Sequence, residues 1–430
     1  MTMRGLYAVG TWVANALLWL ASAWGHPKAR LAVQGRRGWE DRFKAAQSAV
    51  KNAGKTGRWI HVHCASLGEY EQAAPVLSHF RRMAPDRPVL LTFFSPSGRE
   101  AVRRPQADHV DYLPFDTPMA AKRFAQWVKP ADTVLVKYEL WPNLITALHQ
   151  SGTRIHLIAA RFDAGRHPTN GWGGWTRKRL RRLVSIHVQD EASQRVLSSY
   201  GLDSTVSGDP RADRVLDILD LPAPEEVGLA LDRIQKWKGK RRLLLVGSAW
   251  DGEWNALRAF RQKWPEDWAF LVVPHDIQGV RVDQWCSSAD VIRFSDHAEC
   301  ALPPSAGLVL DRVGCLRDGY ALADLAVVGG GWRTGVHNTL EPAAHGVPIA
   351  VGPKVAGFRE ISGLESAGAL TVCATEASLV DWLEAWTSPD AEEERNARGR
   401  AAKGWVTGHR GAAEHIAIDV LNQGRAEEND

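Results

Sequence analysis

Short apolar runs alternate with amphipathic, helix-like segments along the first half of the chain. The apolar runs fall at 58–65, 88–94, 133–138, 154–160 and 185–188, and helical periodicity falls at 71–83 and 143–150. Strands that alternate with helices in this way pair in parallel, because each crossover helix returns the chain to the same edge of the sheet. The pattern therefore predicts an α/β fold in which helices cover both faces of a parallel sheet.

A second series of apolar runs follows a proline-rich, acidic stretch at 219–228, at 242–247, 269–273, 307–310, 325–328 and 348–351. A chain of 430 residues is long enough for two domains. We expect a membrane anchor at 1–25, an N-terminal α/β domain at 26–206, a C-terminal α/β domain at 207–387 and a helical segment at 388–430. The two sheets are expected to face each other across a cleft, with ligands at the carboxyl ends of the strands.

The N-terminal stretch at 6–24 is almost wholly apolar and allows three interpretations. It is long enough for one membrane-spanning helix, it could lie on the membrane as an interfacial helix, and the small residues at its end resemble a signal-peptide cleavage site. The basic residues Lys28, Arg30, Arg36 and Arg37 follow it and suit the cytoplasmic side of a membrane. We therefore favour an anchor, spanning or interfacial, over a cleaved signal, and over a buried core helix.

Composition excludes several other classes of protein. Hydrophobic residues make up 45% and charged residues 24%, as in ordinary globular proteins, and the net charge of +4 gives no reason to expect nucleic acid as a partner. The cysteines are odd in number and show no C-x-x-C spacing, which argues against a disulfide framework and a zinc site; they are Cys64, Cys286, Cys300, Cys315 and Cys373.

The segment at 327–353 carries the strongest chemical signal. A buried strand leads into Gly329, Gly330 and Gly331, and glycines let the backbone approach a ligand closely. Asn338 is expected to open a helix whose N–H groups face a phosphate, with Glu341 one turn later placed to accept bonds from ribose hydroxyls. This is the layout of a nucleotide-sugar site. The alternative is that Asn338 and Glu341 form only a capping box.

Three motifs follow strand ends in the first domain. Glu69, in the motif at 66–69, is a candidate general base, and its alternative role is to complement a helix dipole. Glu139 follows another strand and has no obvious structural role, whereas Trp141 beside it is expected to pack the strand–helix corner. Arg211, in the motif at 207–211, could contact a phosphate, although most such arginines are simply solvated.

The strand ends of the second domain carry Ser248, the pair Pro274 and His275, and a segment at 311–316. His275 alone is more often a structural or surface histidine than a ligand contact. No Asp-x-Asp motif stands at these strand ends, so we expect a mechanism without a metal ion or other cofactor.

The motifs SLGE, YELWPN, SGDPR, VVPHD and GGGWRTGVHNTLEPAAHGVPIAVGP occur in this order and together resemble the 3-deoxy-D-manno-octulosonic acid (Kdo) transferases of lipid A assembly. The resemblance implies a GT-B glycosyltransferase with two Rossmann-like domains. It also implies a CMP-Kdo donor in the C-terminal domain and a lipid A precursor near the N-terminal one. The enzyme would act at the cytoplasmic side of the inner membrane.

By the same resemblance, Glu69 matches the catalytic base, and Glu139 and Arg211 match residues that support the transition state. The expected contacts with the nucleotide sugar are Ser66, Gly68, Ser248, Pro274, His275, Gly314, Cys315, Leu316, Gly330, Gly331, Asn338, Thr339, Leu340 and Glu341. The chain departs from the family at Arg211, usually lysine, at His275, often arginine, and at Cys315, often glutamate. The alternatives are another GT-B enzyme, such as a UDP-sugar epimerase or transferase, and a catalytically silent, membrane-associated nucleotide binder.

Overall fold

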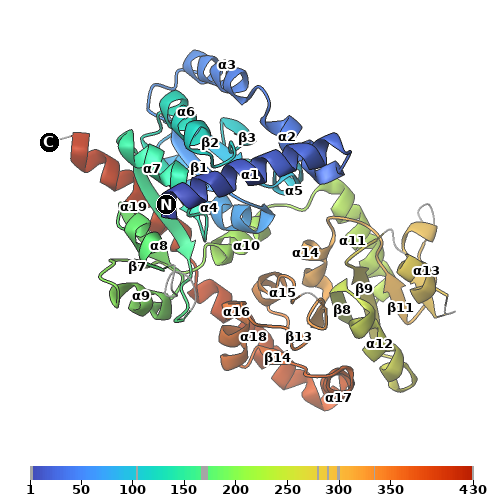
Figure 1. Cartoon of the computed structure of the whole chain (residues 1–430). Coiled ribbons are helices and arrows are strands. Elements are labelled where there is room, and N and C mark those ends of the chain that lie inside the picture. Colours follow the sequence, from blue (N-terminus) through green and yellow to red (C-terminus); the bar gives the residue numbers. More distant parts are fainter. Residues whose placement is uncertain are drawn as a thin grey trace. The chain divides into compact units, whose positions relative to one another are not determined.

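The chain folds into two compact units (Figure 1). The computed structural model describes residues 3–102, 105–165, 173–277, 280–287, 290–297, 301–333 and 335–428. Unit 1 comprises residues 1–214 and 410–430, and unit 2 comprises residues 215–409. The division after 214 lies beyond the expected boundary at 206, and the C-terminal segment at 388–430 is shared between the units rather than forming a segment of its own.

Unit 1 is built on a seven-stranded, wholly parallel sheet of order β3-β2-β1-β4-β5-β6-β7. Its strands are β1 (Ile60–Cys64), β2 (Val89–Phe93), β3 (His109–Tyr112), β4 (Asp132–Val136), β5 (Arg154–Ala160), β6 (Ser185–Val188) and β7 (Thr205–Val206). The strand order reverses between the adjacent strands β1 and β4, and the carboxyl ends of strands at such a switch point are where ligands bind in open α/β sheets.

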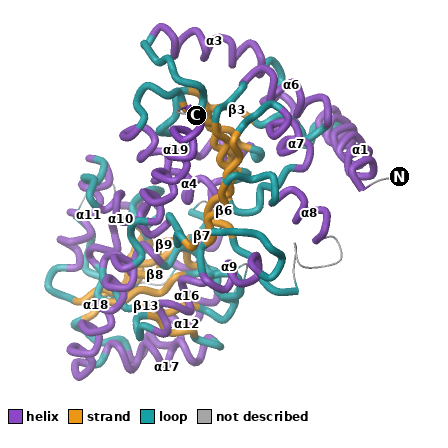
Figure 2. The backbone as a smooth tube through the Cα atoms, turned by 90° about the vertical axis from the view of Figure 1, so that its left-hand side faces the viewer, coloured by secondary structure: helices purple, strands orange, loops and turns teal. Residues whose placement is uncertain are grey.

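Helices cover both faces of this sheet, so β1, β2 and β4 are buried along their whole length. These helices are α4 (Leu67–Met83), α5 (Pro96–Ala101), α6 (Pro118–Val128), α7 (Pro142–Gln150), α8 (Gly173–Leu180), α9 (Glu191–Ser198) and α19 (Ala412–Glu428), and α10 (Arg211–Leu219) leads into unit 2. Figure 2 shows α4 and α19 on one side of the strands and α6 and α7 on the other, matching the two hydrophobic clusters of the unit.

Unit 2 repeats the same architecture with a parallel sheet of order β10-β11-β9-β8-β12-β13-β14. Its strands are β8 (Arg242–Ala249), β9 (Trp268–Pro274), β10 (Val291–Arg293), β11 (Gly307–Val309), β12 (Leu325–Val328), β13 (Ile349–Val351) and β14 (Leu370–Val372). Its helices are α11 (Glu225–Lys238), α12 (Asp251–Phe260), α13 (Val280–Trp285), α14 (Leu316–Gly319), α15 (Leu340–His345), α16 (Arg359–Ser366), α17 (Glu376–Thr387) and α18 (Glu392–Gly408).

Three helices precede the first sheet: α1 (Met3–Ala23), α2 (Pro27–Arg36) and α3 (Trp39–Asn52). The window Gly5–Ala23 of α1 has a mean hydropathy of 1.3, enough by length and composition to cross a membrane, and none of it is fully buried. The predicted apolar helix at the N-terminus is therefore present, and it exposes its surface instead of entering a core.

Candidate active site

Glu69 stands in the first turn of α4, directly after the carboxyl end of the central strand β1. Its Oε2 accepts hydrogen bonds from the backbone N–H of Ser66, at 2.9 Å, and from the Ser66 hydroxyl. Glu69 and Ser66 thus form a capping box, the structural alternative to a catalytic role. Both bonds end on Oε2, and Oε1 makes no hydrogen bond within the described part of the chain, so one carboxylate oxygen is left to accept a proton.

Glu139 lies after the adjacent strand β4, where Lys137 adopts a positive φ of 63°. The Glu139 side chain is only 14% exposed, and its Oε2 accepts a 2.7 Å bond from the indole N–H of Trp141. The interpretation that Glu139 has no structural role is therefore wrong, because the indole holds its carboxylate. The packing role predicted for Trp141 is confirmed, since its ring stacks on Phe94 with centroids 4.7 Å apart.

Glu69 and Glu139 follow the adjacent strands β1 and β4, and the carboxylates of both act on the Cys64 thiol. Burial raises the pKa of the Cys64 thiol well above its usual value, and the negative charges of Glu69 and Glu139 raise it further, which places both carboxylates near the end of β1. The structure thus brings together two of the three residues expected to act in catalysis, at the switch point of the sheet.

His63 is a neighbour of this site that sequence reasoning missed. Its side chain is fully buried in β1, its Nδ1 is 2.9 Å from the Thr92 hydroxyl, and its Nε2 lies 3.6 Å from Glu139 Oε2. His61 contacts the same hydroxyl through Nε2, so two imidazoles share Thr92. The available signal was the alternation IHVHC, since residues two apart in a strand face the same side.

Arg211, the third expected catalytic residue, is paired within its own turn. Its Nε and one terminal nitrogen donate to Asp209 Oδ2 at 2.9 and 2.6 Å, and its backbone N–H donates to Oδ1. Burial raises the pKa of the Asp209 carboxyl, but the charge and hydrogen bonds of Arg211 outweigh that effect and leave the pKa below its usual value. Asp209 also accepts a bond from Gln72, so this turn rests against α4, the helix that carries Glu69.

In unit 2 the glycine run after β12 is required by the packing of the chain itself. A Cβ on Gly329 would lie 2.2 Å from the carbonyl oxygen of Ser248, and a Cβ on Gly331 would lie 2.5 Å from the Cα of Gly352. Gly330 adopts a φ of +93°. The structure gives these glycines a packing role, because a side chain at Gly329 or Gly331 would collide with backbone at the ends of β8 and β13.

Glu253, a second residue that sequence reasoning missed, supports this run. Its side chain is 1% exposed, and its two oxygens accept the backbone N–H groups of Trp250, at 2.9 Å, and Gly330, at 3.0 Å. Burial raises the pKa of the Glu253 carboxyl, although these N–H groups offset part of the rise. One buried carboxylate therefore joins the start of α12 to the glycine run.

His275 belongs to a stack of rings at the carboxyl end of β9. Its imidazole lies between Trp250 and His337, with both pairs of centroids 4.5 Å apart, and the guanidinium of Arg333 covers Trp250 at 4.1 Å. Burial lowers the pKa of His337, and His275 lowers it further, which favours a neutral ring. His275 is the exposed ring of this stack, whereas Trp250 and His337 are partly buried.

The helix expected to open at Asn338 begins later. α15 starts at Leu340 with Thr339 as its cap, so the helix begins two residues after the predicted position. The Asn338 amide donates to Glu341 Oε1 at 3.0 Å, and its carbonyl oxygen accepts the N–H of Leu340. This is a variant of the capping interpretation of Asn338 and Glu341.

Gly68, another predicted contact with the nucleotide sugar, lies in the first turn of α4 in unit 1. The remaining predicted contacts lie in unit 2. Ser248, at the end of β8, has a φ of +52°, and Gly314 has a φ of +92°. Cys315 is completely buried at the start of α14, and Pro274, Thr339 and Leu340 are buried as well, so these positions present backbone rather than side chains.

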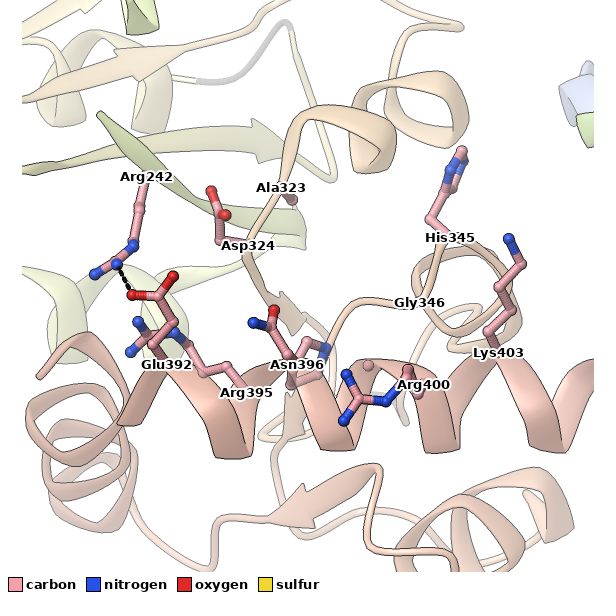
Figure 3. A pocket seen from close by; sticks show the side chains of 12 residues that line it. Arg242, Ala323, Asp324, His345, Gly346, Glu392, Arg395, Asn396, Arg400 and Lys403 are labelled. Atoms are coloured by element: carbon pink, nitrogen blue, oxygen red, sulfur yellow. Dashed lines mark hydrogen bonds and ion pairs between the residues drawn. The ribbon is translucent and has the colours of Figure 1, made fainter. Parts of the chain in front are cut away.

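The cavity of about 360 Å³ in Figure 3 lies elsewhere in unit 2, beside α18 and the amino ends of β8 and β12. Arg242 pairs with Glu392 at one end of it, and His345 and Lys403 stand at the other. None of the predicted site residues lines it. In the described residues no three His, Cys, Asp or Glu side chains gather to hold a metal ion. Cys64, Cys286, Cys315 and Cys373 are free thiols, and Cys300 lies outside the described residues.

Comparisons with known proteins agree with the motifs. Residues 37–214 match the family model for 3-deoxy-D-manno-octulosonic-acid transferase (kdotransferase). The 3-deoxy-D-manno-octulosonic acid transferase of Bordetella pertussis is 30% identical over 97% of this chain and 98% of its own length. The enzyme of the same name from Haemophilus influenzae is 28% identical, over 84% of this chain and 86% of its own.

Solved structures agree on the fold alone. A UDP-GlcNAc 2-epimerase from Neisseria meningitidis superposes with a TM-score of 0.60 at 12% identity, covering 85% of this chain and 100% of its own. A glycosyltransferase from Rickettsia africae gives 0.58 at 11%, over 85% and 99%. Both support the GT-B architecture of two Rossmann-like sheets. The sequence relatives favour Kdo transfer over a UDP-sugar enzyme or a silent nucleotide binder. The chain therefore belongs to the 3-deoxy-D-manno-octulosonic acid transferase family and is a Kdo transferase.

Proposed function

We propose that this enzyme moves Kdo from CMP-Kdo to a sugar hydroxyl of a lipid A precursor, with inversion at the anomeric carbon and without a metal ion. The observation that carries the proposal is the carboxylate of Glu69, held by Ser66 through one oxygen and open at the other, at the switch point of the first sheet. A fixed carboxylate with one open oxygen is suited to take a proton from an attacking hydroxyl.

The chemical step then balances as follows. The acceptor O–H bond breaks and its proton goes to Glu69 Oε1, while the acceptor oxygen forms a bond to the anomeric carbon of Kdo. The bond from that carbon to the phosphate oxygen breaks, and CMP leaves with the electron pair. Positive charge develops on the sugar ring, and the carboxylate of Glu139, fixed by Trp141, is suited to stabilise it. Arg211 could compensate the charge on the departing phosphate once it leaves Asp209.

The donor is assigned to unit 2 because the expected CMP contacts gather there after the strand ends. Exposed His275 stands at the carboxyl end of β9, and the backbone around Gly314 and Gly330 follows other strands of the same sheet. The departures from the family at His275 and Cys315 change side chains only, and buried Cys315 can still present its backbone.

The acceptor and the location are assigned from the N-terminal helix. A lipid A precursor is confined to a membrane, and the exposed apolar surface of α1 would keep the enzyme on that membrane. The cations that follow α1 favour the cytoplasmic side of the inner membrane. The predicted partners are thus the lipid acceptor, the CMP-Kdo donor and the membrane surface.

The test is Glu69→Gln in an assay with CMP-Kdo generated in situ, a tetraacylated lipid A precursor and mass spectrometry of the lipid. The unchanged enzyme should add one or more Kdo units. Glutamine can still accept the Ser66 N–H, so the fold should persist while transfer falls by about 10²–10⁴-fold. The matched control is Glu71→Gln on the same helix, whose carboxylate pairs with Arg214. Full activity of Glu69→Gln would remove the base assignment, and no increase in the mass of the lipid with the unchanged enzyme would overturn the proposal.

A further inference from the structure

The outward side of α1 is more apolar than the side that packs on unit 1, which is the reverse of a helix on a globular protein. The side turned toward unit 1 carries Met3, Tyr7, Thr11, Asn15, Leu18 and Ser22, spaced three or four residues apart and partly buried. The outward side carries Leu6, Val9, Val13, Leu17 and Leu20, each 51–60% exposed. A soluble helix turns its apolar stripe inward, so the outer surface of α1 is built for an apolar environment.

The inward stripe is fastened near its N-terminal end. The Tyr7 hydroxyl donates to Asp116 Oδ2 at 2.9 Å, and the Tyr7 ring lies 5.3 Å from that of Trp175. Asp116 is itself buried and accepts the first N–H groups of α7, from Asn143 and Leu144. Tyr7 is therefore bonded to a group that belongs to the interior of unit 1.

A second attachment lies near the other end of the helix. The guanidinium of Arg37, at the end of α2, covers the ring of Trp19 at 4.7 Å. Both views show α1 lying against unit 1 next to α7 (Figures 1 and 2). Tyr7 and Trp19 are separated by about 18 Å along a helix at 1.5 Å per residue, so the attachments span most of its apolar length.

A helix that crosses the bilayer cannot keep both attachments. Crossing takes about 20 residues of helix, which would put Tyr7 at one membrane face and Trp19 at the other, while unit 1 lies on a single side. We propose that α1 lies in the plane of the membrane interface, its inward stripe docked on unit 1 and its apolar outward side inserted among the acyl chains. This rests on the membrane association in the proposed function and replaces the spanning interpretation.

Charge indicates which bilayer suits this surface. The only charged residue of α1 is Arg4, and the exposed cations Lys28, Arg30 and Arg37 follow at one end of the helix. An in-plane helix inserts about 5–10 Å deep, where nearby lysines and arginines meet lipid head groups. The partner of this surface is therefore a leaflet that contains anionic lipid.

Topology provides the first test. In a chain whose native cysteines are replaced by serine, Thr2→Cys and Trp24→Cys are probed with a membrane-impermeant maleimide in membrane vesicles of both orientations. An in-plane helix leaves both positions on the side of the enzyme body, so both label in inside-out vesicles and neither labels in right-side-out ones. Labelling of Thr2→Cys in right-side-out vesicles would show a crossing helix and overturn the proposal.

The second test compares two neighbouring leucines. Leu17 points outward at 60% exposure, and Leu18 belongs to the inward stripe. With a nitroxide at Leu17→Cys or Leu18→Cys and the protein on phosphatidylglycerol-containing vesicles, dissolved oxygen should relax the Leu17 label several-fold more strongly. Equal relaxation, as expected for two lipid-facing positions of a crossing helix, would contradict docking. Failure to cosediment with the vesicles would instead contradict the membrane association of the proposed function.

Discussion

At the scale of single residues, the buried carboxylate of Glu253 has the clearest structural role among the residues away from Glu69 and Glu139. Each of its oxygens accepts one backbone N–H, from Trp250 and from Gly330. A buried N–H that loses its acceptor costs about 1–3 kcal/mol. Because glutamine keeps one acceptor oxygen and turns a donor toward the other N–H, one bond is lost.

We expect Glu253→Gln to lower the free energy of unfolding by about 1–3 kcal/mol and to weaken CMP binding, because the glycine run loses its support. Urea unfolding of the full chain and CMP titration are the measurements. Glu365→Gln, at an exposed position of α16, serves as the control and should change neither. Unchanged stability of the Glu253 variant would contradict the role given to its carboxylate.

His187 gives unit 1 a pH dependence of stability. Burial lowers the pKa of His187 to about 4, although Asp419, which its Nε2 contacts at 3.0 Å, raises it in part. As the pH falls, the unfolded chain takes up a proton on His187 before the folded chain does. The neutral ring therefore contributes its full stabilisation of the fold above about pH 6.5, and this contribution is lost toward pH 4. The buried ring of His61, whose pKa is also lowered, acts in the same direction.

The expected outcome is that His187→Gln flattens the loss of stability between pH 6.5 and 4. A shift of the His187 pKa from 6.5 to about 4 corresponds to roughly 3 kcal/mol in the free energy of unfolding. A variant without the imidazole would not lose this amount as the pH falls. Chemical unfolding at several pH values measures the slope. The exposed His149→Gln should keep the slope of the unchanged protein, and an equally steep slope in the His187 variant would refute the assignment.

At the scale of elements, the glycine run joins three strand ends. A Cβ at Gly331 would meet the backbone of Gly352 at 2.5 Å, and backbone atoms cannot move aside as a flexible side chain can. We expect Gly331→Ala to destabilise unit 2 by about 1–3 kcal/mol, as overpacking does, and to weaken nucleotide binding. Thermal unfolding with and without CMP measures both effects.

Gly404→Ala is the matched control for that substitution. Gly404 lies within α18 with open space around its Cα, so alanine should stabilise the helix by about 0.5–1 kcal/mol. If both variants behaved alike, the close packing at Gly331 would not be what constrains the run.

The sequence pattern predicted the elements that are buried on both faces and missed the partly exposed ones. β1, β4, β8 and β12 are buried along all or nearly all of their length, and each was expected. β3 (HVDY) is only partly buried and carries Asp111, which Arg42 binds from α3. Such a strand is held in the sheet by residues that are distant in the sequence, so no local apolar run marks its position.

The sequence likewise predicted some residues of the candidate site and missed others. Strand-end positions such as Glu69 and Glu139 could be found, because turns after parallel strands lie at one edge by construction. His63 and Glu253 could not, because each becomes informative only beside a partner, Glu139 or Gly330, that folding brings from a distant segment. The glycines were found, but whether a ligand or another strand needs their space depends on three dimensions.

At the scale of the whole molecule, unit 1 depends on the last helix of the chain. α19 places Ala413, Ile416 and Val420 in the cluster that contains β1 and α4, and Asp213 accepts the N–H groups of Gly411 and Ala413 at its start. Each fully buried aliphatic side chain contributes about 1.5–3 kcal/mol. The helix therefore contributes an amount comparable to the net stability of an ordinary domain.

A chain that stops after Arg410 should lose cooperative unfolding of unit 1 and all transfer activity, while unit 2 keeps its protection from protease. Limited proteolysis with mass spectrometry locates the unfolded region. A chain that stops after Gln423 keeps the helix residues that pack into the core and should behave as the full chain does. Transfer by the shorter chain would show that α19 is dispensable.

The placement of unit 2 inside the sequence of unit 1 also sets an order of events during synthesis. A ribosome makes α1 and the first sheet early, then makes all of residues 215–409, and makes α19 only after them. Unit 2 can finish folding while unit 1 still exposes the apolar groove that α19 fills. Since exposed apolar surface promotes aggregation during folding, the nascent chain is most vulnerable while residues 215–411 are being made, and synthesis that stops before α19 would leave only the second unit complete.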